Sequence, residues 1–286
     1  MRVQFDCYKC IFNQIVEMAR QLSDDDRERH RFLKHFVSKV VEYSENFTPP
    51  EMASVFYDFY CRETGIDDPY AEVKLKSTEI ARQLYDEFKT AVAASPDPLS
   101  AAIRTVIGGN VIDFGANQDF QLSEISGAIR ETSGMLLDEN ALAEFRDAAR
   151  QAKDIFYILD NCGEAVLDRL LIEELGIEKV TIGVRGKPIL NDITRNELAA
   201  SGLADLPVID TGDRTPGVSL RTSSPEFLKK MRSASLVIAK GQGNFESLND
   251  APDNRNIFFL FRVKCPVIQM QTGAAKNSLI IRRGSC

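Results

Sequence analysis

Six short, nearly continuous apolar runs in the second half of the chain constrain the fold more than any other feature. They are rich in β-branched and aromatic residues, and they read DIFYILD (154–160), KVTIGVRG (179–186), LPVIDTG (206–212), ASLVIAKG (234–241), NIFFLFRV (256–263) and SLIIRRG (278–284). Such runs are typical of strands buried on both faces. Between the first two, GEAVLDRLLIEELG (163–176) fits a crossover helix that ends at Gly176. Strand, helix and strand in this order predict an α/β fold with a mainly parallel sheet flanked by helices, in a Rossmann-like three-layer arrangement.

The first third of the chain has a different pattern. Apolar residues recur at helical spacing up to about residue 99, and Pro49 and Pro50 are placed to end one helix and open the next. SPDP (95–98) is the clearest linker. We therefore expect an all-helical region over residues 1–99 and an α/β catalytic domain over residues 100–286.

Composition and charge exclude several functions. The 286 residues carry 42 acidic and 35 basic side chains, a formal net charge of −7, so no basic field is available to hold nucleic acid. Polar residues interrupt the opening segment, and we expect neither a secretory leader nor a membrane span. Six cysteines spread over so long a chain do not suggest a disulfide scaffold, and we expect a reducing, cytoplasmic location. The oligomeric state cannot be read from the sequence.

Only two histidines are present, and this removes most histidine-based mechanisms. His30 and His35 both lie in the charged run DDDRERHRFLKHF (24–36), whose spacing is that of an amphipathic surface helix. A catalytic Ser-His-Asp or Cys-His site is therefore not expected.

Four polar stretches are the candidate site: GGNVID (108–113), DNCGE (160–164), RGKPILNDIT (185–194) and KGQGNFE (240–246). Three of them follow predicted strands, and parallel α/β sheets bind ligands beyond the carboxyl ends of their strands. The candidate catalytic residues are Asp160, Asn161, Asp192 and Lys240. The candidate substrate-binding residues are Asn110, Asp113, Glu164, Arg185, Asn191 and Asn244.

The chemistry of these residues favours a hard cation. Asp160, Asn161 and Asp192 offer carboxylate and amide oxygens, which suit Mg²⁺ or Mn²⁺ better than zinc. Such a cation could polarise a phosphoryl oxygen and bind the attacking water, while Lys240 in a glycine-rich turn would neutralise phosphate charge. Taken singly, each stretch also fits a helix cap or a turn, because Asp, Asn and Gly are the usual residues there. Four stretches at one sheet edge favour the site.

The same stretches resemble a known family. DNCGE is similar to the D-N-x-G-E/A element of the DUF89 damage-control phosphatases, RGKPILNDIT to their R-G-x-P-x-x-N-D-x-T element, and KGQGNFE to their K-G-x-x-N element. GGNVIDFG and the early CYKC (7–10) resemble the prokaryotic branch with a CxxC motif. The resemblance covers nearly the whole chain. Where some eukaryotic relatives carry an acidic residue, this chain has Gln242.

The resemblance implies a specific activity. A divalent metal (Mg²⁺, Mn²⁺, Co²⁺ or Ni²⁺) would be bound by Asp160, Asn161 and Asp192, with phosphate near Lys240. The protein would hydrolyse phosphate monoesters of small, damaged or surplus metabolites such as sugar phosphates or nucleotides.

Other phosphatase chemistries do not match the sequence. Asp160 is followed by Asn161 and Cys162, which departs from the D-x-D-x-T of aspartyl-phosphate enzymes. Six residues separate Cys162 from Arg169, one more than the C-x5-R of cysteine phosphatases. The sequence contains no G-x4-G-K-[ST] phosphate loop.

Three questions stay open from the sequence. Without a nearby histidine, the general base would be a carboxylate, and Asp113, Glu164 and Asp210 are the candidates. Cys7 and Cys10 are too few for a structural zinc site and fit buried helix residues, a thiol-redox pair, or a metal shared with Cys61 or Cys265. A metal- and metabolite-binding module without turnover is the alternative to an enzyme.

Overall fold

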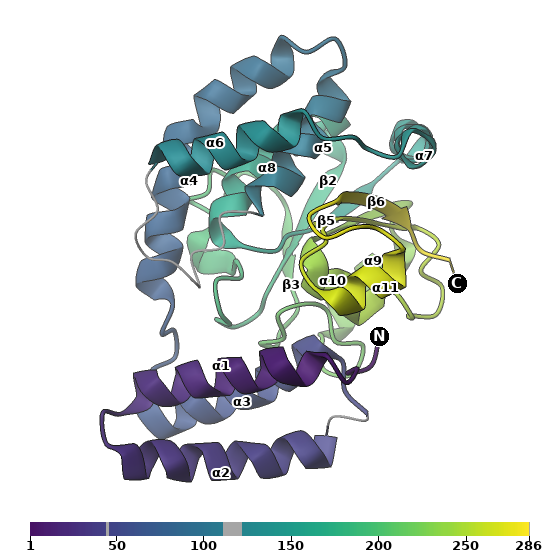
Figure 1. The fold of residues 1–286 in the computed structure, drawn as a ribbon. Helices are drawn as coiled ribbons and strands as arrows, with labels where there is room; N and C mark the ends of the chain where they lie inside the picture. The colour runs from purple at the N-terminus through teal and green to yellow at the C-terminus, as the bar shows by residue number, and fades with distance from the viewer. Residues whose placement is uncertain (44–45, 111–121, 286) are drawn as a thin grey trace.

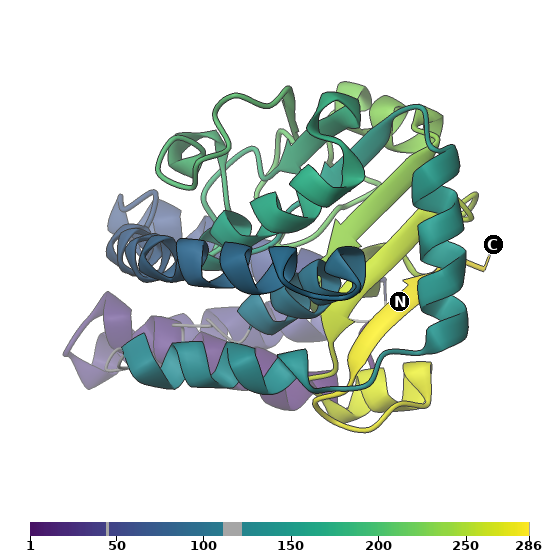
Figure 2. The ribbon, with the colours of Figure 1, turned by 90° about the horizontal axis from the view of Figure 1, so that it is seen from above.

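The fold is built on one six-stranded sheet. The structure, a computed structural model, describes residues 1–43, 46–110 and 122–285. The strands are β1 (Ile155–Ile158), β2 (Val180–Val184), β3 (Val208–Asp210), β4 (Leu236–Lys240), β5 (Ile257–Arg262) and β6 (Leu279–Arg283). Their order is β3-β2-β1-β4-β5-β6, with the first five strands parallel and β6 antiparallel to β5 at the edge (Figure 2). The α/β fold with a mainly parallel sheet is confirmed.

Helices cover both faces of the sheet because successive strand residues point to opposite sides. Ile155 and Tyr157 of β1 pack into a cluster with α4 (Ala71–Ala93), α5 (Pro98–Gly109), α6 (Leu122–Ser133), α7 (Glu139–Gln151) and α8 (Cys162–Leu175). Phe156 and Ile158 point the other way, into a cluster with α9 (Pro225–Ser233), α10 (Gly241–Leu248) and α11 (Pro266–Thr272). The predicted crossover helix is α8, and Gly176 follows it directly. Short 3₁₀ helices cover Ile177–Lys179 and Arg195–Glu197.

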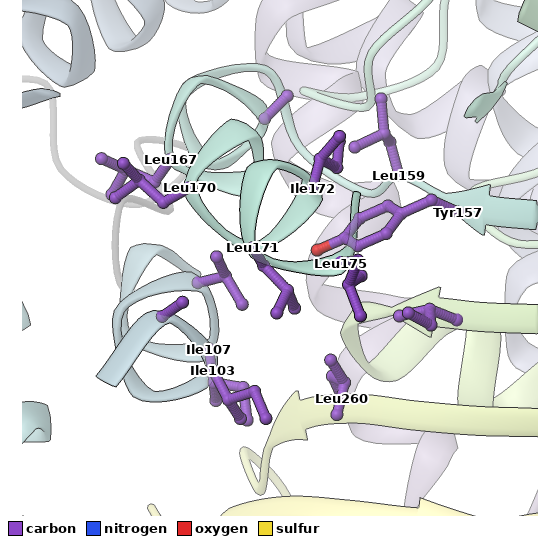
Figure 3. Packing of buried hydrophobic residues seen from close by; sticks show 14 of the residues in the cluster. Ile103, Ile107, Tyr157, Leu159, Leu167, Leu170, Leu171, Ile172, Leu175 and Leu260 are labelled. Atoms are coloured by element: carbon purple, nitrogen blue, oxygen red, sulfur yellow. The ribbon is translucent and has the colours of Figure 1, made fainter. Parts of the chain in front are cut away.

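The pairing of α5 with α8 forms the centre of the larger cluster. Figure 3 shows Ile103 and Ile107 of α5 facing the leucines of α8, with Tyr157 of β1 and Leu260 of β5 closing the sheet side. Leu171 lies between these surfaces and is fully buried. This packing fixes the start of α8 and the end of α5, which both lie at the carboxyl edge of the sheet.

The first three helices form a separate bundle below the sheet (Figure 1). They are α1 (Cys7–Leu22), α2 (Asp26–Tyr43) and α3 (Pro49–Thr64), and they share a hydrophobic cluster of their own. As predicted, Pro49 and Pro50 open α3, and Thr48 completes the start with a capping box to Glu51. Ile189, from the loop after β2, is buried in this cluster, so the bundle is anchored beside the sheet edge.

The hydrophobic clusters do not follow the predicted boundary at residue 99. Ala81, Leu84 and Phe88 of α4 pack into the sheet cluster with α5 and α8. The bundle cluster takes its helical residues from α1, α2 and α3 and ends near Tyr70. Helical periodicity alone could not separate α4 from the bundle, because both have one apolar face.

No helix in the described parts of the chain is long and apolar enough to cross a membrane.

The packing predicts a large effect at Leu171. Leu171→Ala should lower the free energy of unfolding by about 2–5 kcal/mol, because the buried side chain leaves a cavity between α8, α5 and the sheet. Leu75→Ala on α4, where the leucine is 62% exposed, is the control and should change it by less than about 0.5 kcal/mol. Urea unfolding of both variants measures the difference, and equal losses would contradict the packing.

Candidate active site

Asp160 and Asn161 lie just past the carboxyl end of β1, where α8 begins at Cys162. Asn161 occupies the N-cap position, yet its side chain makes no capping hydrogen bond. Its Nδ2 instead donates to Asp160 Oδ2 at 3.1 Å and to Glu164 Oε2 at 3.5 Å. The simple interpretation of this motif as a helix cap therefore does not account for Asn161.

The loop after β2 carries Asp192 back to the same place. Arg185 N donates to Ile193 O at 3.0 Å, Ile193 N to Asp160 O at 2.9 Å, and Cys162 N to Asn191 O at 2.9 Å. Asn161 and Asp192 consequently form an isolated antiparallel bridge. These backbone bonds place the predicted metal ligands on adjacent stretches of chain.

Arg185 links the two aspartates. Its Nε donates to Asp192 Oδ2 at 2.7 Å, and its Nη2 lies 3.6 Å from Asp160 Oδ1. The guanidinium is 1% exposed, and its Nη1 and Nη2 have no hydrogen-bond acceptor among the described residues. A buried donor without an acceptor is costly, so these two nitrogens are suited to an oxygen-rich ligand such as phosphate.

Lys240 lies in a buried ion cluster that is connected to these residues. Its Nζ donates to Val106 O at 3.1 Å, to Asp168 Oδ1 at 2.7 Å and to Glu164 Oε1. Glu164 Oε2 in turn accepts from Asn110 Nδ2, which also donates to Asp160 Oδ2 at 3.1 Å. A chain of contacts therefore runs from Lys240 through Glu164 and Asn110 to Asp160.

This placement bears on the phosphate contact expected for Lys240. The residue is fully buried, and all three of its ammonium donors are used. The glycine-rich segment is the first turn of α10, which begins at Gly241 directly after β4. A contact between Lys240 and phosphate stays a prediction, and it would require Nζ to exchange one of its partners.

Gly241 explains why glycine follows the lysine. Its φ is +77°, in the left-handed region, and a Cβ there would lie 1.9 Å from Asp160 Oδ2. The side chain of Asp160 therefore approaches the backbone of this turn too closely for any residue other than glycine.

The buried charges do not balance. Asp160, Asp192, Glu164 and Asp168 carry four negative charges when ionised, against two positive charges on Arg185 and Lys240. Burial raises the pKa of Asp160 well above its ordinary value, and the neighbouring charges of Asp192 and Glu164 raise it further. Burial likewise raises the pKa of Asp168 to about 6, although Lys240 opposes the shift. An additional cation beside Asp160 would relieve this excess.

The side chains supply only part of the coordination that a hard divalent cation needs. Among residues 1–43, 46–110 and 122–285, no three histidine, cysteine, aspartate or glutamate side chains are grouped to hold a metal ion. Asp160, Asn161 and Asp192 provide two carboxylates and one amide, so water or substrate would complete the coordination, as is usual for Mg²⁺. The Asn161 amide presents its nitrogen to Asp160, and it would have to turn over to bind a cation through oxygen.

The remaining candidates have mixed outcomes. Asn244 Nδ2 donates to Lys240 O at 2.7 Å and to Leu159 O at 3.4 Å, which ties the ends of β4 and β1 together. Asn191 takes part through its backbone oxygen, as described above. Asp113 lies outside the described residues. Asp210 forms an ion pair with Arg195 and accepts a hydrogen bond from Gly212 N. Its partners therefore lie outside the cluster.

The histidines and the cysteine pair do not join this cluster. His30 and His35 are exposed on α2, as expected. Burial raises the pKa of both Cys7 and Cys10, which is opposite to the lowered pKa of a reactive thiolate. The thiol-redox alternative therefore has no support from their surroundings.

Asp168 and Tyr157, two residues of the cluster, escaped the sequence analysis. Asp168 contacts Lys240 and also accepts from Tyr157 Oη at 2.8 Å. It lies one helical turn after Glu164, so both carboxylates share the face of α8 that is turned to the sheet. Two acids on the apolar face of a crossover helix were the available signal.

Comparisons with known proteins point to one family. Residues 3–280 match the family model of the damage-control phosphatase ARMT1-like domain. A damage-control phosphatase from Pyrococcus horikoshii is 36% identical, covering 99% of this chain and 98% of that protein. A damage-control phosphatase from Archaeoglobus fulgidus is 25% identical over 99% of both chains.

A solved structure shares the whole fold. The crystal structure of a DUF89 family protein from Pyrococcus horikoshii matches with a TM-score of 0.88 and 33% identity, covering 100% of both chains. Together with the family match over nearly the entire sequence, this shows that the chain belongs to the ARMT1-like (DUF89) family of damage-control phosphatases.

Proposed function

We propose that the protein is a divalent-metal-dependent phosphatase that hydrolyses phosphate monoesters of small, damaged or surplus metabolites. The single observation that carries this proposal is the convergence of Asp160 and Asp192 on Arg185, with Asn161 bonded to Asp160; the two terminal nitrogens of Arg185 have no hydrogen-bond acceptor within the described part of the chain. The names of the Pyrococcus and Archaeoglobus relatives support phosphatase activity. The metal dependence and the substrate class rest on the chemistry of the site.

Asp160, Asn161 and Asp192 would hold the cation, for which Mg²⁺, Mn²⁺, Co²⁺ and Ni²⁺ are the candidates. The bound cation would polarise a phosphoryl oxygen and help to activate the attacking water. Arg185 would donate from Nη1 and Nη2 to the phosphoryl oxygens and so orient the group that is transferred.

Lys240 acts in this proposal as a positioning residue. Its ammonium holds Glu164 in place, and Glu164 in turn fixes Asn110 and Asn161 beside Asp160. Glu164 is 1% exposed and bonded on both oxygens, so it is poorly placed to accept a proton from water. We therefore do not propose Glu164 as the general base.

The cysteines bear on the cellular compartment. The five cysteines among the described residues are all free thiols. We infer a cytoplasmic location on this basis, with a small phosphorylated metabolite as the partner.

Asp192→Asn tests the metal site. Removing one carboxylate weakens a hard-cation site whose affinity depends on ligand charge, so activity should fall at low metal and recover at least partly as Mn²⁺ or Mg²⁺ is raised. Phosphate release across a metal titration measures the effect. Asp205→Asn, which changes an exposed partner of Arg169, is the matched control and should titrate like the parent protein. If Asp192→Asn retains full turnover at low metal, the proposed ligand set is wrong.

Lys240→Met should fail in a different way. It leaves Glu164 and Asp168 buried without their cation, which should lower the free energy of unfolding by about 3–5 kcal/mol. Turnover should fall because the contacts to Asp160 loosen, and added metal should not restore it. Urea unfolding and the same metal titration check both effects at a temperature where the variant is folded. Full rescue by metal would contradict the positioning role.

A binding module without turnover is distinguished by the same assays. Metal-dependent release of inorganic phosphate from any phosphate monoester supports the enzyme. Metal and ligand binding without phosphate release, tested over a panel of phosphorylated metabolites, would favour the binding module.

A further inference from the structure

A cavity of about 600 Å³ opens beside the proposed phosphatase site. Its walls come from α1 and the start of α3 on one side, and from α10 and the start of α11 on the other. Leu190 lies in its wall two residues before Asp192, and Gln242 follows Gly241, which contacts Asp160. Lys264 also lines it, and its charge partly opposes the burial that raises the pKa of Asp160. The cavity therefore adjoins the predicted metal ligands.

The walls of this cavity are mostly of low polarity. Four prolines line it, Pro49, Pro50, Pro216 and Pro266, together with the thiols of Cys7, Cys10 and Cys265. The amide of Gln242 is already engaged, since Nε2 donates to Glu246 Oε1 at 2.8 Å and Oε1 accepts from Lys264 N at 3.1 Å. Burial raises the pKa of Glu246 to about 7. Asp6, Lys9, Asn13 and Gln14, from α1 and the residue before it, also line the cavity. Most of the lining surface is nevertheless apolar, so a ligand rich in hydroxyl groups would leave those that face the prolines and thiols unpaired, which is unfavourable.

The backbone conformation at Leu190 supports a ligand site at this wall. Its φ is +47°, in the left-handed region that a leucine rarely adopts. Strained residues of this kind cluster at ligand sites and are held by their surroundings. Here Ile189 is buried in the helical bundle, while the chain turns at Leu190 to bring Asn191 and Asp192 to the sheet edge.

We propose that this cavity holds the organic group of the substrate and selects phosphate monoesters with an apolar, ring-sized group over small polyhydroxy ones. The inference rests on the proposed function, because that function places the phosphate at Arg185 and the predicted metal ligands, which the cavity adjoins. A volume of about 600 Å³ lies within the roughly 300–1,000 Å³ of pockets for drug-sized ligands. Leu190 is the specificity-determining residue, since it lies between the cavity and Asp192.

Thiol protection tests occupancy of the cavity without turnover. At saturation, 1-naphthylphosphonate, whose carbon–phosphorus bond is not a phosphate ester, should slow alkylation of Cys10 by N-ethylmaleimide about fivefold or more. Inorganic phosphate should not, because it does not fill the cavity. Cys61 is the control. It is half-buried, its Sγ accepts a hydrogen bond from Arg214 Nη1, and it lies outside this cavity. Unchanged alkylation of Cys10, or equal slowing at Cys61, would overturn the proposal.

Substitution at Ala53 tests selectivity. Ala53→Phe should fill part of the cavity and lower kcat/KM for 1-naphthyl phosphate about tenfold more than for glycerol 3-phosphate. Ala93→Phe, at the exposed end of α4, is the matched control and should leave this ratio unchanged. Should Ala53→Phe not fold, Leu190→Gly, which suits the left-handed backbone and removes the cavity wall, should lower the preference for the naphthyl ester.

These outcomes separate the two proposals. If no phosphate monoester is hydrolysed but Cys10 is protected by 1-naphthylphosphonate, the proposed function fails and the cavity assignment stands. If the protein hydrolyses both esters and the ratio is unaffected by Ala53→Phe and Leu190→Gly, the cavity assignment is wrong while the phosphatase activity stands.

Discussion

The ion cluster of Lys240 with Glu164 and Asp168 is the interaction on which the rest of the site depends. It joins the end of β4 to the buried face of α8 and, through Val106 O, to α5. Burying three charges is costly, and removal of one member leaves the others uncompensated. The cluster therefore persists only because the three elements are held together by their apolar packing, and it transmits that rigidity to Asn110, Asn161 and Asp160.

The second half of the site depends on the helical bundle. Asp192 lies on a loop whose Ile189 is buried among α1, α2 and α3, and whose backbone is bonded to the chain around Asp160 and Cys162. The two aspartates are therefore held by different parts of the fold. Asp160 is held by the sheet, and Asp192 is held by both the sheet and the bundle. Arg185 contacts both, so the relation of bundle to sheet sets the geometry around its guanidinium.

The sequence predicted the sheet and the meeting of the motifs because both follow from simple patterns. Apolar runs mark buried strands, and the carboxyl ends of parallel strands share one edge, which brings Asp160 and Asp192 together. The position of Lys240 could not be predicted, because a lysine after a strand can face solvent or the interior, and the choice depends on Glu164 and Asp168 of another element. The packing of α4 on the sheet was hidden for a similar reason, since an amphipathic helix does not reveal its partner.

The separate core of the bundle has a consequence for dynamics. Proteins open in cooperative units with different free energies, and a unit with its own hydrophobic cluster can open while the rest stays folded. The bundle supplies α1 and α3 to one wall of the cavity beside the site. The opposite wall comes from α10 and α11, which pack on the sheet. Opening of the bundle would expose the cavity and release the anchor of Ile189 in the same event. Ligand exchange and the integrity of the Asp192 loop would then be coupled through one sub-global motion, with the sheet acting as the fixed frame.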